Sequence, residues 1–176
     1  MTLIFVTGIS GAGKSTVRAE LARRGFAAFD TDEDEIAQWR HKETGCITPL
    51  LAEAHRTPEF LAANEWRAEP ERVLRLADES VGRTTFLCGS VGNEAEVWSF
   101  FDRVFALSVD QVTLQHRLAT RTEHNFGTKP HELELILAWR EVIDDHYLSQ
   151  GATMIDASQP LGRVVDEILL ALEGRS

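Results

Sequence analysis

GISGAGKST, residues 8–16, follows the apolar run LIFVT at residues 3–7. The stretch fits the pattern G-x-x-x-x-G-K-[ST] with Gly8, Gly13, Lys14 and Ser15. In such a loop, glycines adopt backbone angles closed to other residues, so that successive N–H groups turn toward phosphate oxygens and the next helix adds its positive end. With an apolar strand before it and an amphipathic stretch after it, the pattern predicts a phosphate-binding loop.

We expect this loop to bind ATP together with Mg²⁺. Lys14 would reach the β and γ phosphates and take part in catalysis, while the Ser15 hydroxyl would ligate the ion. The loop residues expected to contact the nucleotide are Gly8, Ser10, Gly11, Ala12, Gly13, Lys14, Ser15 and Thr16. The loop alone leaves open how the protein uses the nucleotide.

Length and charge narrow the class of protein. The chain has 176 residues, and its 28 acidic against 18 basic side chains give a formal net charge of −10. This length suits a single domain over residues 1–176. The negative charge disfavours binding to nucleic acid or to an anionic membrane. An anionic ligand therefore needs a local group of basic side chains.

Cysteine usage and hydropathy point to the cytoplasm. Cys46 and Cys88 lack C-x-x-C spacing, so neither a disulfide framework nor a zinc site is indicated. The first residues lack the basic flank of a signal peptide, and no apolar run approaches the roughly 20 residues of a membrane span. We expect a cytoplasmic monomer or homodimer whose partners are ATP and a small-molecule acceptor.

Apolar runs alternate with amphipathic stretches along the chain, as in α/β proteins with a parallel sheet. The predicted strands are Leu3–Thr7, Ala27–Asp30, Thr84–Cys88, Val104–Val109 and Thr153–Asp156. Helix starts are predicted at Thr57-Pro58, at Lys129-Pro130 and near Ser158 with Pro160. The sequence therefore predicts a three-layer α/β sandwich around a five-stranded parallel sheet.

Two segments interrupt this alternation. Residues 38–80, rich in Glu, Arg, Ala and Trp, have no obvious strand, and we expect a helical insertion that binds the acceptor. The polar residues 122–132 contain Gly and Pro between two helices, which is typical of a mobile flap. We expect a short lid at about residues 121–131.

The ends of the second and third strands separate classes of nucleotide-binding protein. Motors, transporters and switches usually place a Mg²⁺-associated Asp at the end of a later strand, but here the third strand ends in Cys88 and Gly89. Carboxylates instead follow the second strand, at Asp30 and Asp32. Parallel strands end on one edge, so both should face the phosphate loop. Their neighbours, residues 33–35, are expected to cap a following helix.

The loop, the D-T-D at residues 30–32, the glycines after the third strand and HRLATRT at residues 116–122 together resemble the P-loop small-molecule and nucleoside-monophosphate kinases. This group includes shikimate kinase, gluconate kinase and adenylate kinase. The resemblance implies that Asp30 is linked to Mg²⁺ and that Asp32 contacts the accepting hydroxyl. A carboxylate near the acceptor could also take its proton during phosphoryl transfer.

Arginines beside the expected lid suit the same chemistry. Arg117 and Arg121 are four residues apart, on one face of a helix, and resemble the paired lid arginines of these kinases. Arg117 is then a nucleotide contact, Arg121 a catalytic cation and Arg140 a substrate contact. Ser158 lies in DASQP, where this group wraps a loop around adenine. A solvated basic face is the alternative for the arginine pair.

The acceptor side is less specific. Gly89 and Gly92 match the position of the glycine-rich acceptor loop of shikimate kinase, and we expect both to approach substrate. The insertion carries aromatic and basic side chains that suit an anionic or a planar acceptor: Trp39, Arg40, His41, His55, Arg56, Trp66, Arg67 and Arg72. Arg67 is the substrate contact chosen among them. Burial of Trp66 in the core and surface ion pairs are equally open.

These observations predict an ATP- and Mg²⁺-dependent phosphotransferase that acts on a small hydroxylated metabolite. A nucleoside monophosphate kinase is the nearest alternative and differs only in the acceptor. A regulatory ATPase that signals to a protein partner is the alternative from another class.

Overall fold

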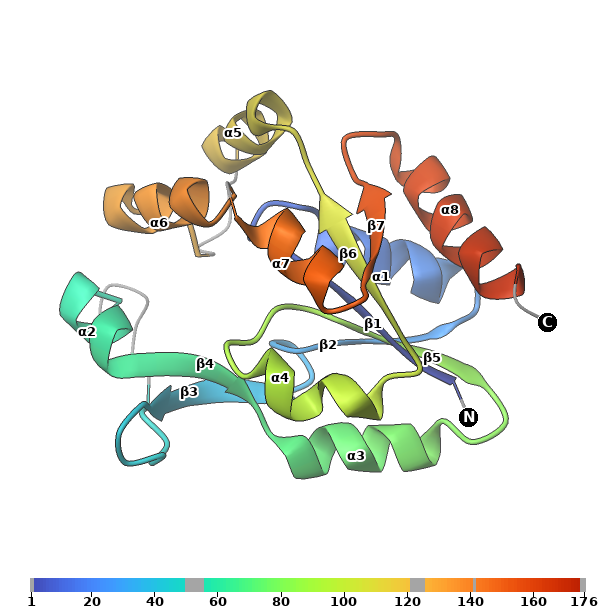
Figure 1. Ribbon diagram of the computed structural model, residues 1–176, viewed down its shortest axis with the longest axis horizontal. Helices are drawn as coiled ribbons and strands as arrows, with labels where there is room; N and C mark the ends of the chain where they lie inside the picture. The colour runs from blue at the N-terminus through green and yellow to red at the C-terminus, as the bar shows by residue number, and fades with distance from the viewer. Residues whose placement is uncertain (1, 50–55, 121–125, 141, 175–176) are drawn as a thin grey trace.

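The computed structural model describes residues 2–49, 56–120, 126–140 and 142–174. Its main sheet has five parallel strands in the order β2-β5-β1-β6-β7 (Figure 1). Their bounds are β1 Thr2–Gly8, β2 Ala27–Asp30, β5 Thr84–Cys88, β6 Arg103–Ser108 and β7 Thr153–Asp156. All five predicted strands are confirmed, and so is the predicted sheet.

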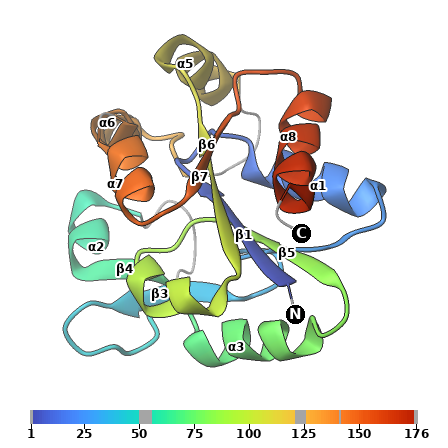
Figure 2. The same ribbon diagram turned by 45° about the vertical axis from the view of Figure 1, so that its right-hand side comes forward.

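Helices cover both faces of this sheet because β1 is apolar on both sides. Leu3 and Phe5 pack on one face, and Ile4 and Val6 pack on the other. The Ile4 face carries α1 (Lys14–Arg23) and α8 (Leu161–Glu173), which lie side by side in Figure 2. The Leu3 face carries α3 (Pro70–Glu79), α4 (Glu94–Val97), a 3₁₀ turn at Trp98–Phe100 and α7 (Ile143–Ser149).

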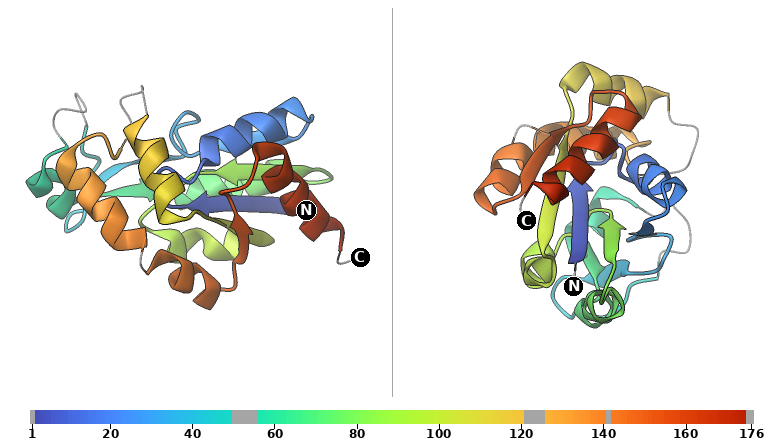
Figure 3. Two further views of the ribbon diagram at one scale, coloured as in Figure 1. Left: turned by 90° about the horizontal axis from the view of Figure 1, so that it is seen from above. Right: turned by 90° about the vertical axis from the view of Figure 1, so that its right-hand side faces the viewer.

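Three layers result from this arrangement, as predicted. In the left-hand view of Figure 3, α1 and α7 lie on opposite sides of β1. Two further helices, α5 (Gln111–Ala119) and α6 (Pro130–Arg140), contribute Leu114 and Ile136 to the core on the α1 face.

The predicted helix starts are confirmed at two places. Helix α2 (Pro58–Ala63) begins after Thr57, whose hydroxyl oxygen accepts a hydrogen bond from the N–H of Phe60 at 3.2 Å, and α6 begins at Pro130. The last helix begins at Leu161, directly after Pro160.

The insertion differs from the prediction. It holds two strands, β3 (Ala37–His41) and β4 (Asn64–Ala68), which form an antiparallel ribbon with Trp39 opposite Trp66. Each strand has five residues, three of which are polar or charged, so neither reads as an apolar run. Figure 1 shows the ribbon projecting from one end of the molecule, with α2 at its far end. The expectation of an insertion without strands is therefore wrong.

The expectation for residues 33–35 is also wrong. No helix follows them; they form a turn that leads into β3, and Glu35 has a φ of 54°. The carboxylate of Asp34 accepts a hydrogen bond from the N–H of Asp30 at 2.7 Å, which closes this turn. The turn keeps Asp30 and Asp32 on the edge where the parallel strands end.

The two cysteines have opposite surroundings. Cys88 is buried at the end of β5, and Cys46 is exposed in the turn that follows β3. Among the helices of the described residues, none has the length and apolar character that crossing a membrane requires.

Candidate active site

The phosphate loop connects β1 to α1 and depends on glycine for its shape. Gly13 has a φ of 103° directly before α1, in the left-handed region that side chains rarely allow. Gly8 has a φ of 139°, and a Cβ there would lie 2.7 Å from the carbonyl oxygen of Leu107 on β6. The loop therefore packs directly on the neighbouring strand.

Lys14 folds onto the loop. Its ammonium group donates hydrogen bonds to the carbonyl oxygens of Gly8 at 2.7 Å and Ile9 at 2.9 Å. Ser90, which follows β5, also donates to the Gly8 oxygen at 2.9 Å. The sequence alone does not suggest a role for Ser90, because the residue that it bonds to lies 82 positions away in the chain. Lys14 and Ser90 therefore share one acceptor at the start of the loop.

The residues predicted to hold Mg²⁺ lie together. The Ser15 hydroxyl donates to Asp30 Oδ2 at 3.3 Å, and Asp30 is 4% exposed. Arg18, one turn further along α1, has its Nε 4.0 Å from the same oxygen. A hydroxyl and one carboxylate suit Mg²⁺, which keeps several waters and binds phosphate oxygens. The described residues contain no group of three or more His, Cys, Asp or Glu side chains arranged for a metal.

Asp32 is held by one of its two carboxylate oxygens. Its Oδ1 accepts hydrogen bonds from the Thr31 hydroxyl at 2.8 Å and from Trp66 Nε1 at 3.2 Å. Oδ2 has no hydrogen-bond partner among the described residues. The side chain reaches solvent, yet desolvation by the surrounding protein raises its pKa, and the charge of Asp30 adds to this effect. One oxygen is thus fixed and the other is available.

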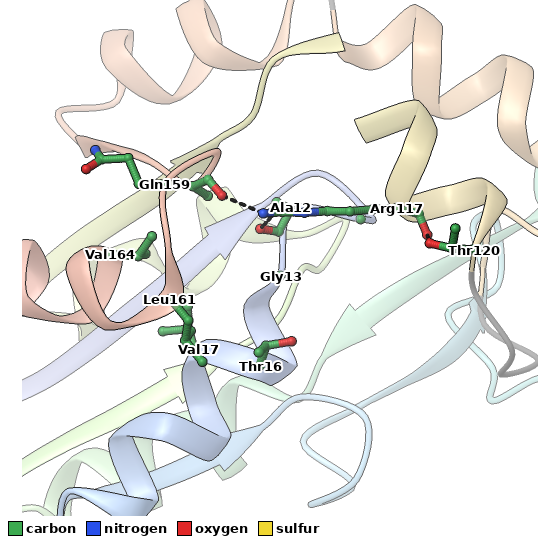
Figure 4. A pocket seen from close by; sticks show the side chains of 11 residues that line it. Ala12, Gly13, Thr16, Val17, Arg117, Thr120, Gln159, Leu161 and Val164 are labelled. Atoms are coloured by element: carbon green, nitrogen blue, oxygen red, sulfur yellow. Dashed lines mark hydrogen bonds between the residues drawn. The ribbon is translucent and has the colours of Figure 1, made fainter. Parts of the chain in front are cut away.

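A cavity of about 400 Å³ lies beside the loop. It is lined by Gly11, Ala12, Gly13, Thr16, Val17, Arg117, Thr120, Ala157, Gln159, Leu161 and Val164. Figure 4 shows Arg117 crossing this cavity, where its guanidinium donates to the carbonyl oxygens of Ala12 at 3.0 Å and Ala157 at 2.7 Å. Arg117 therefore joins the phosphate loop to the segment after β7.

Other predicted residues near this cavity have protein partners. The N–H of Asp110 donates to the Ser158 hydroxyl at 3.1 Å, which directs Ser158 to the start of α5, and Ser158 is not among the residues that line the cavity. Ser10 donates to the carbonyl oxygen of Phe126 at 3.0 Å. Arg121 lies outside the described residues, as does the lid up to residue 125.

The predicted acceptor residues are more dispersed. Arg67 forms ion pairs with Glu65 and Glu96. Arg140 donates from Nε to the carbonyl oxygen of Val109 at 2.7 Å. A Cβ on Gly89 would lie 1.9 Å from the hydroxyl oxygen of Thr31, and one on Gly92 would lie 2.4 Å from the side chain of Glu65. Both glycines are thus required by packing within the protein.

A buried ion pair links the insertion to helix α6. Arg56 Nε donates to Glu132 Oε1 at 2.8 Å, and the side chains are 9% and 0% exposed. Burial opposes ionisation of Glu132, but the N–H of Gly127 and the guanidinium of Arg56 outweigh it and lower its pKa. The Arg56 guanidinium also lies over the ring of Phe126, 5.8 Å from its centre. Sequence reasoning missed this pair, since 76 residues separate its members.

A second buried group supports the end of β1. Glu94 Oε1 accepts hydrogen bonds from the hydroxyls of Thr7 and Tyr147, both at 3.0 Å. Burial raises the pKa of Glu94, although these two bonds act in the opposite direction. The three side chains connect β1, α4 and α7 at the end of β1 that leads into the phosphate loop.

Comparisons with known proteins agree with this geometry. A family model described as an AAA domain matches residues 4–137. The chain belongs to this family. None of the curated proteins matches the chain.

Solved structures of P-loop kinases share the fold. Shikimate kinase from Acinetobacter baumannii in complex with shikimate has a TM-score of 0.63 and 19% identity, over 99% of this chain and 95% of that one. An unliganded sugar kinase from Janibacter sp. has a TM-score of 0.55 and 18% identity, over 98% and 95%. Deoxyadenosine kinase from M. mycoides has a TM-score of 0.56 and 13% identity, over 99% and 100%. The predicted resemblance to P-loop kinases is confirmed for the fold.

Proposed function

We propose that the protein transfers the γ-phosphoryl group of ATP, with Mg²⁺, to a hydroxyl of a small-molecule acceptor. One observation carries the proposal: a complete phosphate loop and the carboxylates of Asp30 and Asp32 lie on the same edge of the sheet. Motion or switching does not require a second carboxylate with an available oxygen. The P-loop kinase fold supports the same conclusion.

The nucleotide would occupy the cavity beside the loop. Backbone N–H groups of residues 8–13 and the start of α1 suit its phosphates, and Arg117 lies across the cavity. Lys14 would exchange its bonds to loop carbonyl oxygens for bonds to phosphate oxygens. Arg121 stays a predicted catalytic cation, and Ser158 a predicted nucleotide contact.

Ser15 and Asp30 would hold Mg²⁺. When bound, the ion neutralises charge on the phosphate oxygens and orients them. The Ser15 hydroxyl is already directed at the Asp30 carboxylate, so the pair would need little movement to accept the ion. Arg18 lies close enough to balance the Asp30 charge when no ion is bound.

Asp32 would act on the acceptor. The acceptor oxygen forms a bond to the γ-phosphorus while the bond from that phosphorus to the β–γ bridging oxygen breaks. The hydroxyl proton passes to Oδ2 of Asp32, and ADP leaves with the electron pair of the broken bond. Arg67, Gly89, Gly92 and Arg140 stay predicted substrate contacts around this position.

The test uses ATP, Mg²⁺ and a panel of sugar acids, cyclic polyols, nucleosides and nucleoside monophosphates, with ADP release and phosphorylated product as readouts. With the acceptor that works, Asp32→Asn should lower kcat about 10²–10⁴-fold and leave ATP binding unchanged. Asp78→Asn, at an exposed carboxylate of helix α3, is the matched control. Full activity of Asp32→Asn would remove its role. ADP release stimulated by a protein partner and by no acceptor would favour the regulatory ATPase.

A further inference from the structure

The two faces of the β3–β4 ribbon differ in chemistry. Residues directly opposite each other in an antiparallel pair share a face, and successive residues alternate between faces. Trp39 and Trp66 are opposite each other, and their ring centres lie 5.4 Å apart. Gln38 with Arg67, and Arg40 with Glu65, occupy the other face. The ribbon therefore has an aromatic face and a charged face.

The aromatic face is the one next to Asp32. Trp66 donates from Nε1 to Asp32 Oδ1 at 3.2 Å, which brings the edge of its indole ring to the proposed catalytic carboxylate. Trp39 and Phe60 extend the same surface, with ring centres 5.1 Å apart. All three rings are half-buried, so each keeps some exposed surface. A ligand that reaches Asp32 along the ribbon would meet these rings.

The arginines of the charged face are already paired with carboxylates of the protein. Arg40 is paired with Glu69, and Arg67 with Glu65 and Glu96. Lys42, at the end of the ribbon, donates to the carbonyl oxygens of Leu61 and Ala62. These basic side chains are thus engaged within the protein. The carboxylates of Asp32, which accepts a hydrogen bond from Trp66, and of Asp30 beside it would repel an anion.

We propose that the acceptor packs the face of a ring against the indole of Trp39, with the Trp66 ring at 63° to it, and that it is an uncharged, hydroxylated cyclic molecule, either a nucleoside or a cyclic polyol. The inference rests on the proposed phosphotransferase function, because Asp32 defines where the hydroxyl must lie. The base of a nucleoside or the C–H face of a polyol ring gains apolar contact with an indole without any charge. Its hydroxyl would then reach Oδ2 of Asp32.

Pairs of uncharged and anionic acceptors test whether the site prefers an uncharged molecule. ATP with adenosine or cytidine is compared with ATP and the corresponding 5′-monophosphate, and myo-inositol is compared with gluconate and shikimate. We expect the uncharged member of each comparison to have at least tenfold higher kcat/KM. The comparison of adenosine and cytidine with myo-inositol shows whether the acceptor is a nucleoside or a cyclic polyol. Preference for an anion, lost in Arg56→Gln, would overturn the inference, since Arg56 Nη2 is a buried nitrogen without a hydrogen-bond partner among the described residues.

A binding measurement separates this inference from the proposed function. The variant Trp98→Phe/Trp139→Phe leaves Trp39 and Trp66 as the two emitting tryptophans. Titration with adenosine or myo-inositol should change their fluorescence saturably, whether or not phosphate is transferred. Saturable binding without transfer would remove the proposed function and keep the stacking site. Transfer to an acceptor that leaves this fluorescence unchanged would remove the stacking site and keep the function.

Single variants locate the contact. Trp39→Leu keeps an apolar side chain but removes the flat ring, and it should weaken acceptor binding about tenfold or more without changing KM for ATP. Trp66→Phe keeps a ring and removes the N–H, so it should change kcat more than acceptor binding. Arg40→Gln, on the charged face, is the control and should change neither acceptor binding nor kcat. An effect of Arg40→Gln equal to that of Trp39→Leu would contradict the assignment.

Discussion

The phosphate loop and the acceptor side of the site are held together in different ways. In the loop, Lys14 bonds to carbonyl oxygens five and six residues earlier in the chain. On the acceptor side, 34 residues separate Trp66 from Asp32, and 76 separate Arg56 from Glu132. Its glycines and Lys14 make the loop recognisable in the sequence, although Ser90, Arg117 and Phe126 also contact it from distant parts of the chain. The acceptor side depends on the whole fold, so its variants should affect stability and activity together.

The largest expected effect lies in the loop. Lys14→Ala should lower phosphoryl transfer at least about 10²–10³-fold, because one charged donor to the transferred group is lost. The free energy of unfolding should change little, since Ala suits the first turn of a helix. Arg23→Ala, at an exposed ion pair with Glu20 on the same helix, is the control for both measurements. If Arg23→Ala lost as much activity as Lys14→Ala, the effect could not be assigned to the Lys14 ammonium group in the phosphate loop.

Breaking the ion pair between Arg56 of the insertion and Glu132 of helix α6 should instead lower the free energy of unfolding. Glu132→Ala leaves the buried Arg56 guanidinium without its carboxylate and should cost about 3–5 kcal/mol in the free energy of unfolding. Denaturant unfolding followed by circular dichroism measures the change. Glu69→Ala, which removes the half-buried partner of Arg40, should cost about 1 kcal/mol or less. Equal costs would show that burial does not distinguish the two pairs.

Gly89 tests the junction between the two regions. A Cβ there would overlap the Thr31 side chain next to Asp32, so Gly89→Ala should destabilise the protein by about 1–3 kcal/mol. Gly162 lies in helix α8, and a Cβ on it would meet only the Arg24 guanidinium, at 3.9 Å. Gly162→Ala should therefore stabilise by about 0.5–1 kcal/mol. Thermal unfolding of both variants gives the comparison, and destabilisation by Gly162→Ala as large as that by Gly89→Ala would contradict it.

The smallest effect concerns Glu94 at the end of β1. Because its folded-state pKa is raised, the folded protein binds this proton more tightly than the unfolded chain does, so stability falls as the pH rises toward the folded pKa. Glu94→Gln keeps an acceptor for Thr7 and Tyr147 but does not titrate. Its free energy of unfolding should exceed that of the wild type by on the order of 1 kcal/mol at pH values above the folded pKa of Glu94, and should equal it at pH values below the unfolded pKa. Unfolding measured from pH 4 to about 8 would show the difference, and a constant offset would contradict it.

The sequence predicted the regular part of the molecule well. The five strands of the main sheet are apolar runs, and the loop and helix starts have local patterns, so each could be recognised without distant contacts. The pairing of Ser15 with Asp30 also followed from strand ends that share an edge.

The sequence did not reveal contacts made by short or polar segments. The ribbon was missed because its strands combine Trp39 and Trp66 with charged neighbours, and only their pairing shows which face each side chain takes. Glu132 reads as a surface acid in α6 until the fold buries it against Arg56. Gly92 stays a predicted substrate contact, and the structure adds a second reason for glycine there, because a Cβ would meet the Glu65 side chain.

The contrast between the two cysteines has a practical consequence. Burial raises the pKa of the Cys88 thiol well above its usual range, so little reactive thiolate forms at neutral pH. Cys46 is exposed at the turn of the ribbon. A thiol-specific dye should therefore label the unmodified protein at one place, on the acceptor-side ribbon, and report on its movement without an engineered attachment site.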